Sequence, residues 1–212
     1  TVRRLVAVDL ARGIALLGMM LAHLGPQWTG DAPPVGELIS TGRAAPLFAL
    51  LAGVSLTLVH RRDPTGVGSV RATVVRGVLL VLLGLSLGTL RDMPILIIVS
   101  VYGLLVVLAL PARLLSTRSL VVLTAAWSVL APIGLLALRI GRDPVPVDQP
   151  GWSDAREPWQ LLGTLVLWGG YPALVWMAYL LAGLVIGRLD LSDPVTGARL
   201  VGGGLVLTCG AL

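Results

Sequence analysis

Long apolar runs alternate with short polar segments along nearly the whole chain. A helix needs about 20 residues to cross the hydrocarbon core of a bilayer, with about 17 as the lower limit. Six runs are interpreted as complete transmembrane helices, over residues 6–24, 44–59, 75–90, 95–110, 120–138 and 161–186. The second, third and fourth of these runs are shorter than that limit, and we expect flanking residues to extend them.

The sixth and seventh runs differ from the others. Pro172 removes a helical hydrogen bond and follows Gly169 and Gly170, so we expect the sixth run to break there, with Tyr171 lining a cavity near the outer face. A simple kink packed on a neighbouring helix is the alternative. The seventh run, 200–212, is too short to cross. We interpret residues 1–212 as a single transmembrane domain, truncated at its C-terminus, of a longer protein.

Composition supports a membrane protein. Of the 212 residues, 56% are hydrophobic and 13% are charged, and the mean hydropathy is +0.90, which excludes a soluble domain of this length. The expected fold is an all-α integral membrane protein, a polytopic bundle of six complete helices plus the start of a seventh. The one cysteine, Cys209, excludes an intrachain disulfide, and the sequence gives no support for a metal site.

The basic residues predict the orientation. All 16 are arginines, which is typical of a GC-rich bacterial genome, and they lie between apolar runs rather than in one stripe, so nucleic acid is excluded as a partner. With the N-terminus in the cytoplasm, ten arginines lie inside and five outside, as the positive-inside rule requires. We therefore expect a multi-pass protein of the bacterial cytoplasmic membrane. Two long outer loops, 25–42 and 141–160, are candidates to cover an extracytoplasmic site, and Trp28 in the first is a candidate substrate-binding residue.

Three ionisable residues lie in the first run. At about 100° per residue, Asp9 and Arg12 are one turn apart on one face, and His23 returns to within about 40° of Asp9. Ionisable side chains that face lipid are costly, so we expect a stripe that faces the bundle interior and contains Asp9, Arg12, Gly13, Leu16, Met20 and His23. Asp9 and His23 are about 21 Å apart along the axis, which places the acid–arginine pair near the inner surface and the histidine near the outer one.

Each candidate also has a structural interpretation. Asp9 and Arg12 can pair with each other and fix the helix end, and His23 can be an interfacial histidine bonded to a carbonyl. Function is favoured because ionisable groups within a membrane are functional by default. Arg43 either binds an anionic group or anchors the second helix at the interface, and His60 is interpreted as an inner-surface residue.

Small and polar residues within the other runs are interpreted as packing features. Residues 84–88 match the nucleophile-elbow pattern G-x-S-x-G, but that elbow needs a strand–turn–helix, and Ser86 lies in an apolar helix. Gly84 with Gly88, and Gly183 with Gly187, instead indicate faces where helices approach closely, and such faces are also candidates for a homodimer contact. Tyr102 and Tyr179 are expected to pack with one internal hydrogen bond each.

Several segments resemble the transmembrane acyltransferases, which include the heparan-α-glucosaminide N-acetyltransferase family and its YeiB-like bacterial relatives. The family's opening pattern reads roughly R-L-x-x-x-D-x-x-R-G-x-A-x-x-G-M, and it is matched by Arg4, Asp9, Arg12, Gly13, Ala15, Gly18 and Met19. Residues 47–53 resemble the L-F-x-x-L-x-G core of the family's second helix. The late Y-P-x-L-x-W segment is matched by Tyr171, Pro172, Trp176, Tyr179, Gly183, Gly187 and Arg188, and residues 99–111 are similar to the tyrosine–glycine helix more loosely.

The resemblance implies an enzyme that takes an acyl group from cytosolic acyl-CoA, acetyl-CoA in the simplest case, and delivers it to a sugar, glycan or lipid acceptor on the far side. Arg12, with Gly13 and Arg43, is then expected to bind the donor, with Asp9 orienting Arg12. His23 is expected to take the proton of the acceptor. No metal is implied.

The sequence departs from the family at one important place. The sugar acetyltransferases have an active histidine farther along their first extracytoplasmic loop, whereas residues 25–42 contain none, and the position of His23 is often Asn in relatives. His23 is the only extracytoplasmic imidazole here. Two other functions therefore compete with acyl transfer: a transporter or flippase for a small or lipid-linked anion, for which a charged stripe and a broken helix are equally suitable, and a non-catalytic membrane scaffold.

Overall fold

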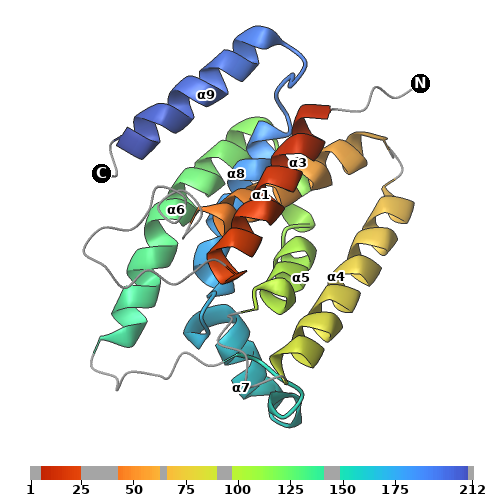
Figure 1. Cartoon of the computed structure of the whole chain (residues 1–212), viewed down its shortest axis with the longest axis vertical. Helices are drawn as coiled ribbons and strands as arrows, with labels where there is room; N and C mark the ends of the chain where they lie inside the picture. The colour runs from red at the N-terminus through yellow and green to blue at the C-terminus, as the bar shows by residue number, and fades with distance from the viewer. Residues whose placement is uncertain (1–5, 25–42, 63–65, 90–96, 141–148, 210–212) are drawn as a thin grey trace.

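The computed structural model describes residues 6–24, 43–62, 66–89, 97–140 and 149–209. Within these ranges all regular secondary structure is helical and there is no strand, which confirms the predicted all-α class. The α-helices, with the labels of Figure 1, are α1 (Val6–Leu24), α3 (Ala44–Arg62), α4 (Val67–Gly88), α5 (Val99–Leu108), α6 (Thr117–Arg139), α7 (Pro158–Gly163), α8 (Ala173–Ile186) and α9 (Pro194–Cys209).

Three of the described helices are long and apolar enough to cross a membrane: Ala44–Arg61 of α3, Val67–Gly88 and Thr117–Arg139. A fourth candidate is the bent pair Pro158–Trp168 and Ala173–Ile186. As expected, flanking residues extend the second and third runs, and they extend the fifth run as well. The extension expected for the fourth run is not found among the described residues. The fourth run forms only the ten-residue α5, followed by a short 3-10 helix over Pro111–Leu114. The other complete spans and the cytoplasmic N-terminus stay predictions.

The predicted break in the sixth run is confirmed. Helix α7 continues into one π-helical turn, Thr164–Trp168, and the chain then leaves the helix until α8 begins at Ala173. The two halves are bent by 59°. Pro172 precedes the first residue of α8, where its missing N–H costs no helical hydrogen bond.

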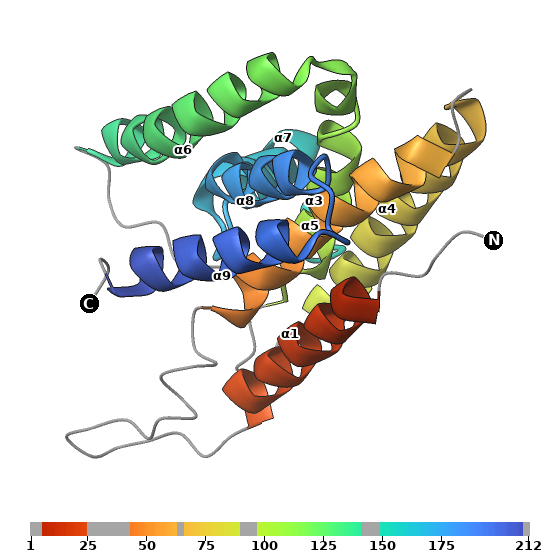
Figure 2. The ribbon, with the colours of Figure 1, turned by 90° about the horizontal axis from the view of Figure 1, so that it is seen from above.

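The centre of the bundle is the contact between α3 and α8 (Figure 2). A Cβ atom on Gly53 would lie 2.1 Å from the Leu180 carbonyl oxygen, and one on Gly183 would lie 1.9 Å from that of Leu50. No side chain fits at either position, so the two backbones touch. Leu180 and Leu184 of α8 are fully buried beside this contact. The sequence prediction of a packing face at Gly183 and Gly187 is thus confirmed.

Helices α4 and α5 form a second close pair. A Cβ on Gly77 would lie 2.9 Å from the carbonyl oxygen of Gly103, and one on Gly84 would lie 2.3 Å from the backbone nitrogen of Ser100. Ser86 lies within α4 and its hydroxyl donates to the Leu82 carbonyl oxygen at 2.9 Å, so the segment is a helix and not a nucleophile elbow. The glycine faces are occupied within the chain, and the homodimer stays a prediction.

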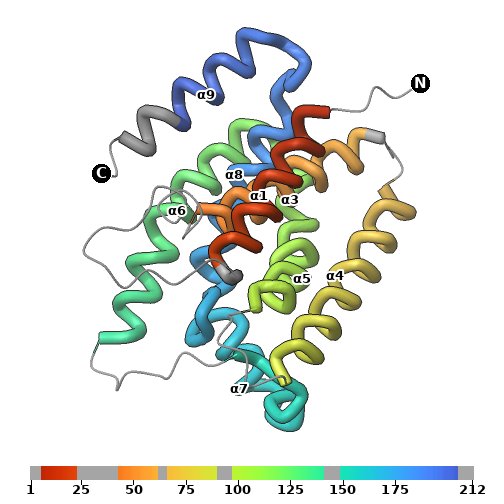
Figure 3. The backbone as a smooth tube through the Cα atoms, in the orientation of Figure 1, coloured from red at the N-terminus to blue at the C-terminus, as the bar shows by residue number. Residues whose placement is uncertain are grey.

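The helices alternate in direction, as Figure 3 shows along the backbone trace. The start of α1, the end of α3, the starts of α4 and α6, and the end of α8 all lie at the upper end in Figure 1. We call this end the arginine end, because Arg61, Arg71, Arg113, Arg118 and Arg188 are there. Helix α9 lies across it, and a Cβ on Gly197 or Gly202 of α9 would contact no other atom within 4 Å.

Candidate functional site

Arg12 joins the outermost helix of the site to the centre of the bundle. Helices α1 and α3 run antiparallel, since a Cβ on Gly18 would lie 3.0 Å from the Ala44 Cβ while Arg12 reaches Ser55. The Arg12 Nη1 donates to Asp9 Oδ1 at 3.4 Å, and Nη2 donates to the Ser55 hydroxyl. The Ser55 hydroxyl in turn donates to the Leu51 carbonyl oxygen. The guanidinium is therefore held from two sides in one orientation.

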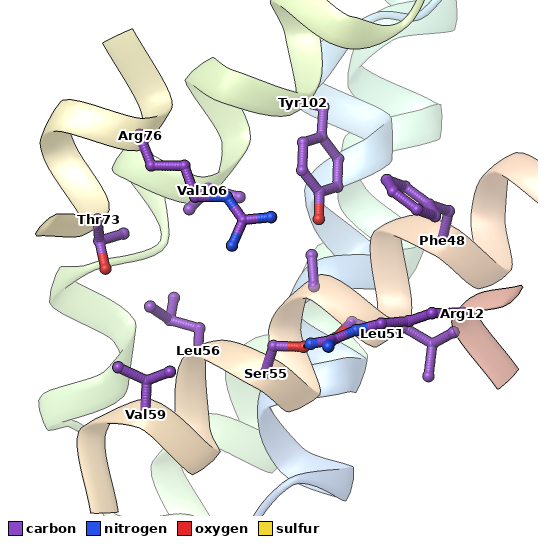
Figure 4. Close-up of a pocket in the computed structure, with 11 residues that line it drawn as sticks. Arg12, Phe48, Leu51, Ser55, Leu56, Val59, Thr73, Arg76, Tyr102 and Val106 are labelled. Carbon is purple, nitrogen blue, oxygen red and sulfur yellow. The ribbon is translucent and has the colours of Figure 1, made fainter. Parts of the chain in front are cut away.

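The Arg12 side chain lines a cavity of about 150 Å³ between α1, α3, α4 and α5. Its polar lining consists of Arg12, Ser55, Thr73, Arg76 and Tyr102, and Phe48, Leu56 and Val106 are among the apolar residues around them. We call it the Arg12 cavity. Figure 4 shows the Arg76 guanidinium and the Tyr102 hydroxyl pointing into it, opposite the Arg12–Ser55 pair.

The charges in the Arg12 cavity favour an anion. Two guanidinium groups line it, and the one ion pair among the described residues, Arg12 with Asp9, neutralises only the first. Arg76 has no hydrogen bond or ion pair with any residue in the described ranges. The Tyr102 ring packs on Phe48 with centroids 5.1 Å apart, and its hydroxyl has no hydrogen-bond partner in the described part of the chain. The internal hydrogen bond expected for Tyr102 is therefore wrong, and this hydroxyl can donate to a ligand.

The size of the cavity limits what it can hold. Pockets for drug-sized ligands have volumes of about 300–1,000 Å³, whereas one water occupies about 30 Å³ in the liquid. A cavity of about 150 Å³ accommodates one anionic group, such as a phosphate or a carboxylate, and not a whole nucleotide. A larger ligand can place one anionic group in the cavity only if the rest of that ligand lies outside it.

The predicted site residues are only partly brought together. Asp9 and Arg12 pair as expected, and both are about 40% exposed. Gly13 is exposed, with no atom within 4 Å of the position of a Cβ. Arg43 directly precedes α3, and its exposed side chain lies about 18 Å along the helix axis from Ser55, so one small anion cannot contact both Arg43 and Arg12.

The two predicted substrate-binding residues are at different places. Trp28 lies outside the described residues. Tyr171 lies in the break before α8, at the end of the bundle opposite the arginine end, where its ring meets Trp176 edge to face with centroids 5.1 Å apart. Tyr171 does not line the Arg12 cavity, and its role in substrate binding stays a prediction.

The predicted inward stripe of α1 is partly wrong. Ala15, which lies about 60° around the helix from Arg12, is the most buried residue of α1 at 1% exposure. Leu16 and Met20 are about half exposed and so face away from the bundle. Arg12 lies at the edge of the buried face and reaches the cavity through its length. The backbone of His23 belongs to α1, and its side chain lies outside the described residues.

Sequence reasoning missed Ser55, Arg76 and Tyr102 as site residues. The third apolar run was predicted to start at residue 75, so Arg76 lay at its very beginning and was counted with the arginines of the inner segments. In the structure α4 begins at Val67, so Arg76 lies about 14 Å along the helix. The length that a membrane-crossing helix needs requires this extension, so the sequence could have placed Arg76 inside the helix. Ser55 and Tyr102 are ordinary residues of apolar helices, and only packing brings them to Arg12.

Comparison of the chain with protein-family models, with curated proteins and with solved structures gives no match in any of the three.

Proposed function

We propose that the protein is a transmembrane acyltransferase. It moves an acyl group, acetyl in the simplest case, from cytosolic acyl-CoA to a hydroxyl or amine of an extracytoplasmic sugar, glycan or lipid acceptor. The observation that carries the proposal is the Arg12 cavity, where Arg12 of the acyltransferase-like first helix, paired with Asp9, lines the same space as a second arginine, Arg76. The proposal locates the protein in the bacterial cytoplasmic membrane, with the arginine end toward the cytoplasm.

The cavity chemistry suits one phosphate group of the donor. Arginine donates in a planar fork that matches phosphate oxygens, and Arg12 and Arg76 approach from different helices. The Tyr102 hydroxyl adds a neutral donor. The nucleotide itself is too large for about 150 Å³ and extends out of the cavity.

The acyl transfer takes place farther along α1. The acceptor oxygen or nitrogen attacks the thioester carbonyl carbon, a C–O or C–N bond forms, and the C–S bond to CoA breaks. His23 accepts the acceptor's proton and passes it to the departing thiolate. His23 lies about 16 Å from Arg12 along the helix axis, so a donor bound at Arg12 by a phosphate has to extend its thioester end by that distance.

A labelling experiment tests this proposal. Membrane vesicles from cells expressing the protein are supplied with radiolabelled acetyl-CoA, with glucosamine as an added acceptor, and label in lipid, glycan and amino-sugar fractions is counted. We expect label above vesicles without the protein, and we expect His23→Ala to abolish it at normal expression. Leu21→Ala, an exposed apolar residue of the same helix, is the matched control. Label that persists in His23→Ala contradicts the catalytic role of His23.

One observation favours a second function, a transporter or flippase for a small or lipid-linked anion. The 59° bend between Pro158–Trp168 and Ala173–Ile186 is a broken span of the kind that forms transport sites. The same vesicles separate the two functions. Without acyl-CoA, a transporter still carries its anion across the vesicle membrane. The acyltransferase forms its product only when acyl-CoA is supplied.

A further inference from the structure

A second cavity lies at the arginine end, where α3 and α8 finish and α6 begins. It has a volume of about 290 Å³ and six polar residues line it: Thr57, His60, Arg61, Arg113, Thr117 and Arg188. None of them lines the Arg12 cavity. We call it the Arg188 pocket, because the side chain of Arg188 crosses from α8 to the start of α6.

Two of the three arginines of the Arg188 pocket, Arg61 and Arg188, donate to backbone and hydroxyl oxygens rather than to acids. Arg188 donates from Nη2 to the Arg113 carbonyl oxygen at 3.0 Å and from Nη1 to the Thr117 hydroxyl at 3.2 Å. Arg61 donates to the Arg188 carbonyl oxygen at 2.6 Å. These bonds hold the two guanidinium groups in position, and the neutral carbonyl and hydroxyl oxygens do not cancel their positive charges.

Among the described residues, no carboxylate forms an ion pair with Arg61, Arg113 or Arg188. No described acid lines the pocket. Asp190 is close enough for the Arg61 charge to act on it, but its carboxylate accepts two hydrogen bonds from Ser192, which are the main reason that the pKa of Asp190 is lowered. Partial burial, together with the charge of Arg61, lowers the pKa of Arg188. The arginines therefore repel one another when the pocket is empty.

Arg113 has donor capacity that the fold does not use. Its Nε is buried and has no hydrogen-bond partner in the described ranges, which is unfavourable for any buried donor and more so for a charged one. Its Nη1 lies 3.2 Å from His60 Nδ1. Because a guanidinium only donates, Nδ1 is the acceptor and the imidazole proton is on Nε2. His60 thus adds a further neutral donor to the pocket.

We propose that the Arg188 pocket binds a phosphate group, at a site separate from the proposed acyl transfer. Three guanidinium groups on three different segments surround one small space, two threonine hydroxyls and one imidazole complete a set of donors, and the volume exceeds that of a phosphate. Its place at the end of the membrane-crossing helices is where lipid headgroups lie. The phosphate belongs either to an anionic lipid headgroup or to a free phosphate compound.

Equilibrium binding to the purified full chain in an uncharged detergent distinguishes the two sources. One arm titrates inorganic phosphate, with chloride at equal ionic strength as the reference. The other arm titrates dioctanoyl phosphatidic acid, with dioctanoyl phosphatidylcholine as the reference. Binding of inorganic phosphate indicates a free phosphate compound, and binding of phosphatidic acid alone indicates a lipid headgroup.

The variants test whether the Arg188 pocket is the binding site. We expect Arg188→Gln and the exposed Arg61→Gln each to weaken binding about tenfold or more, and Arg188→Lys to keep part of it. Arg118→Gln and Arg71→Gln, exposed arginines of the same end that line neither cavity, should bind as the unchanged protein does. The proposal is overturned if neither probe binds more tightly than its reference, or if Arg61→Gln and Arg188→Gln both bind as the unchanged protein does.

Discussion

The Arg12 cavity and the Arg188 pocket are both lined by arginines, but the fold holds those arginines in different ways. In the Arg12 cavity one guanidinium is paired with a carboxylate, Asp9, and a second, Arg76, projects without a described partner. In the Arg188 pocket carbonyl and hydroxyl oxygens fix Arg61 and Arg188, and no described carboxylate lines the space.

This difference should affect how strongly each site binds an anion. A carboxylate reduces the net positive charge and competes with a ligand for the arginine, whereas a carbonyl oxygen orients the arginine without removing its charge. We therefore expect the phosphate site proposed in the Arg188 pocket to bind an anion more strongly than the Arg12 cavity does. In the Arg12 cavity Asp9 competes with a ligand for Arg12, and Arg76 has no partner among the described residues, so we expect weaker binding and faster release there.

The largest effect is expected where one change removes both sites. Helix α3 contributes Ser55 to the Arg12 cavity and Thr57, His60 and Arg61 to the Arg188 pocket, and α8 holds α3 in place. Gly183→Ala puts a methyl group 1.9 Å from the Leu50 carbonyl oxygen, so the helices must separate. Overpacking costs about 1–3 kcal/mol, and a backbone clash belongs at the upper end. We expect a marked loss of folded protein in a thermal size-exclusion assay.

Gly134→Ala is the matched control for this change. Gly134 lies within α6 and a Cβ there meets no atom within 4 Å. Alanine is the better helix former by about 1 kcal/mol, so this variant should be at least as stable as the unchanged protein. If Gly183→Ala is equally stable, the close contact between α3 and α8 is not correct.

Arg76→Gln is expected to have the next largest effect. A hydrogen bond to a charged group contributes about 1.5–3 kcal/mol. For the proposed acyl transfer, losing Arg76, which has no partner among the described residues, should therefore raise the KM for acyl-CoA about ten- to a hundredfold. Initial rates of label transfer measure this. Arg71→Gln, an exposed arginine in the same helix, should leave KM unchanged, and equal effects of the two variants would point to a general loss of surface charge.

Ser55→Ala should have a smaller effect. Arg12 loses the α3 hydroxyl that accepts from Nη2 but keeps Asp9 and access to solvent, because its side chain is 41% exposed. We expect a loss of about 1 kcal/mol, which is about a fivefold rise in KM for acyl-CoA. Ser55→Thr retains the hydroxyl and should restore the value. A Thr variant as impaired as the Ala variant would mean that the hydroxyl is not the cause.

Asp9→Asn is expected to have the smallest effect on donor binding. The pair with Arg12 is 3.4 Å long and about 40% exposed, and such pairs contribute about 0.2–1 kcal/mol. The substitution also raises the positive charge of the Arg12 cavity, which opposes the loss of orientation. The KM for acyl-CoA should therefore change by less than about fivefold. A much larger change would show that Asp9 acts on the ligand itself rather than through Arg12.

The hydrophobic pattern predicted most of the helices. The bounds of α1 and α8 agree with the expected ones, and the break before α8 follows from Pro172, because a proline cannot donate within a helix. The close contact at Gly183 was predictable, since two small residues four positions apart expose the backbone of a helix. The pairing of Asp9 with Arg12 depended only on their spacing within one helix.

The sequence by itself therefore determined the all-helical fold, the apolar helices, the break in the sixth run and the local acid–arginine pair, because all of these depend on residues close together in the chain. Only the tertiary structure decided that Ala15 rather than Leu16 faces the bundle, that Arg12 meets Ser55 and Arg76, and that Arg61, Arg113 and Arg188 surround one space. The rotation of a helix about its axis and the identity of its neighbours depend on how whole helices fit together, and glycines such as Gly53 and Gly183 fix that fit.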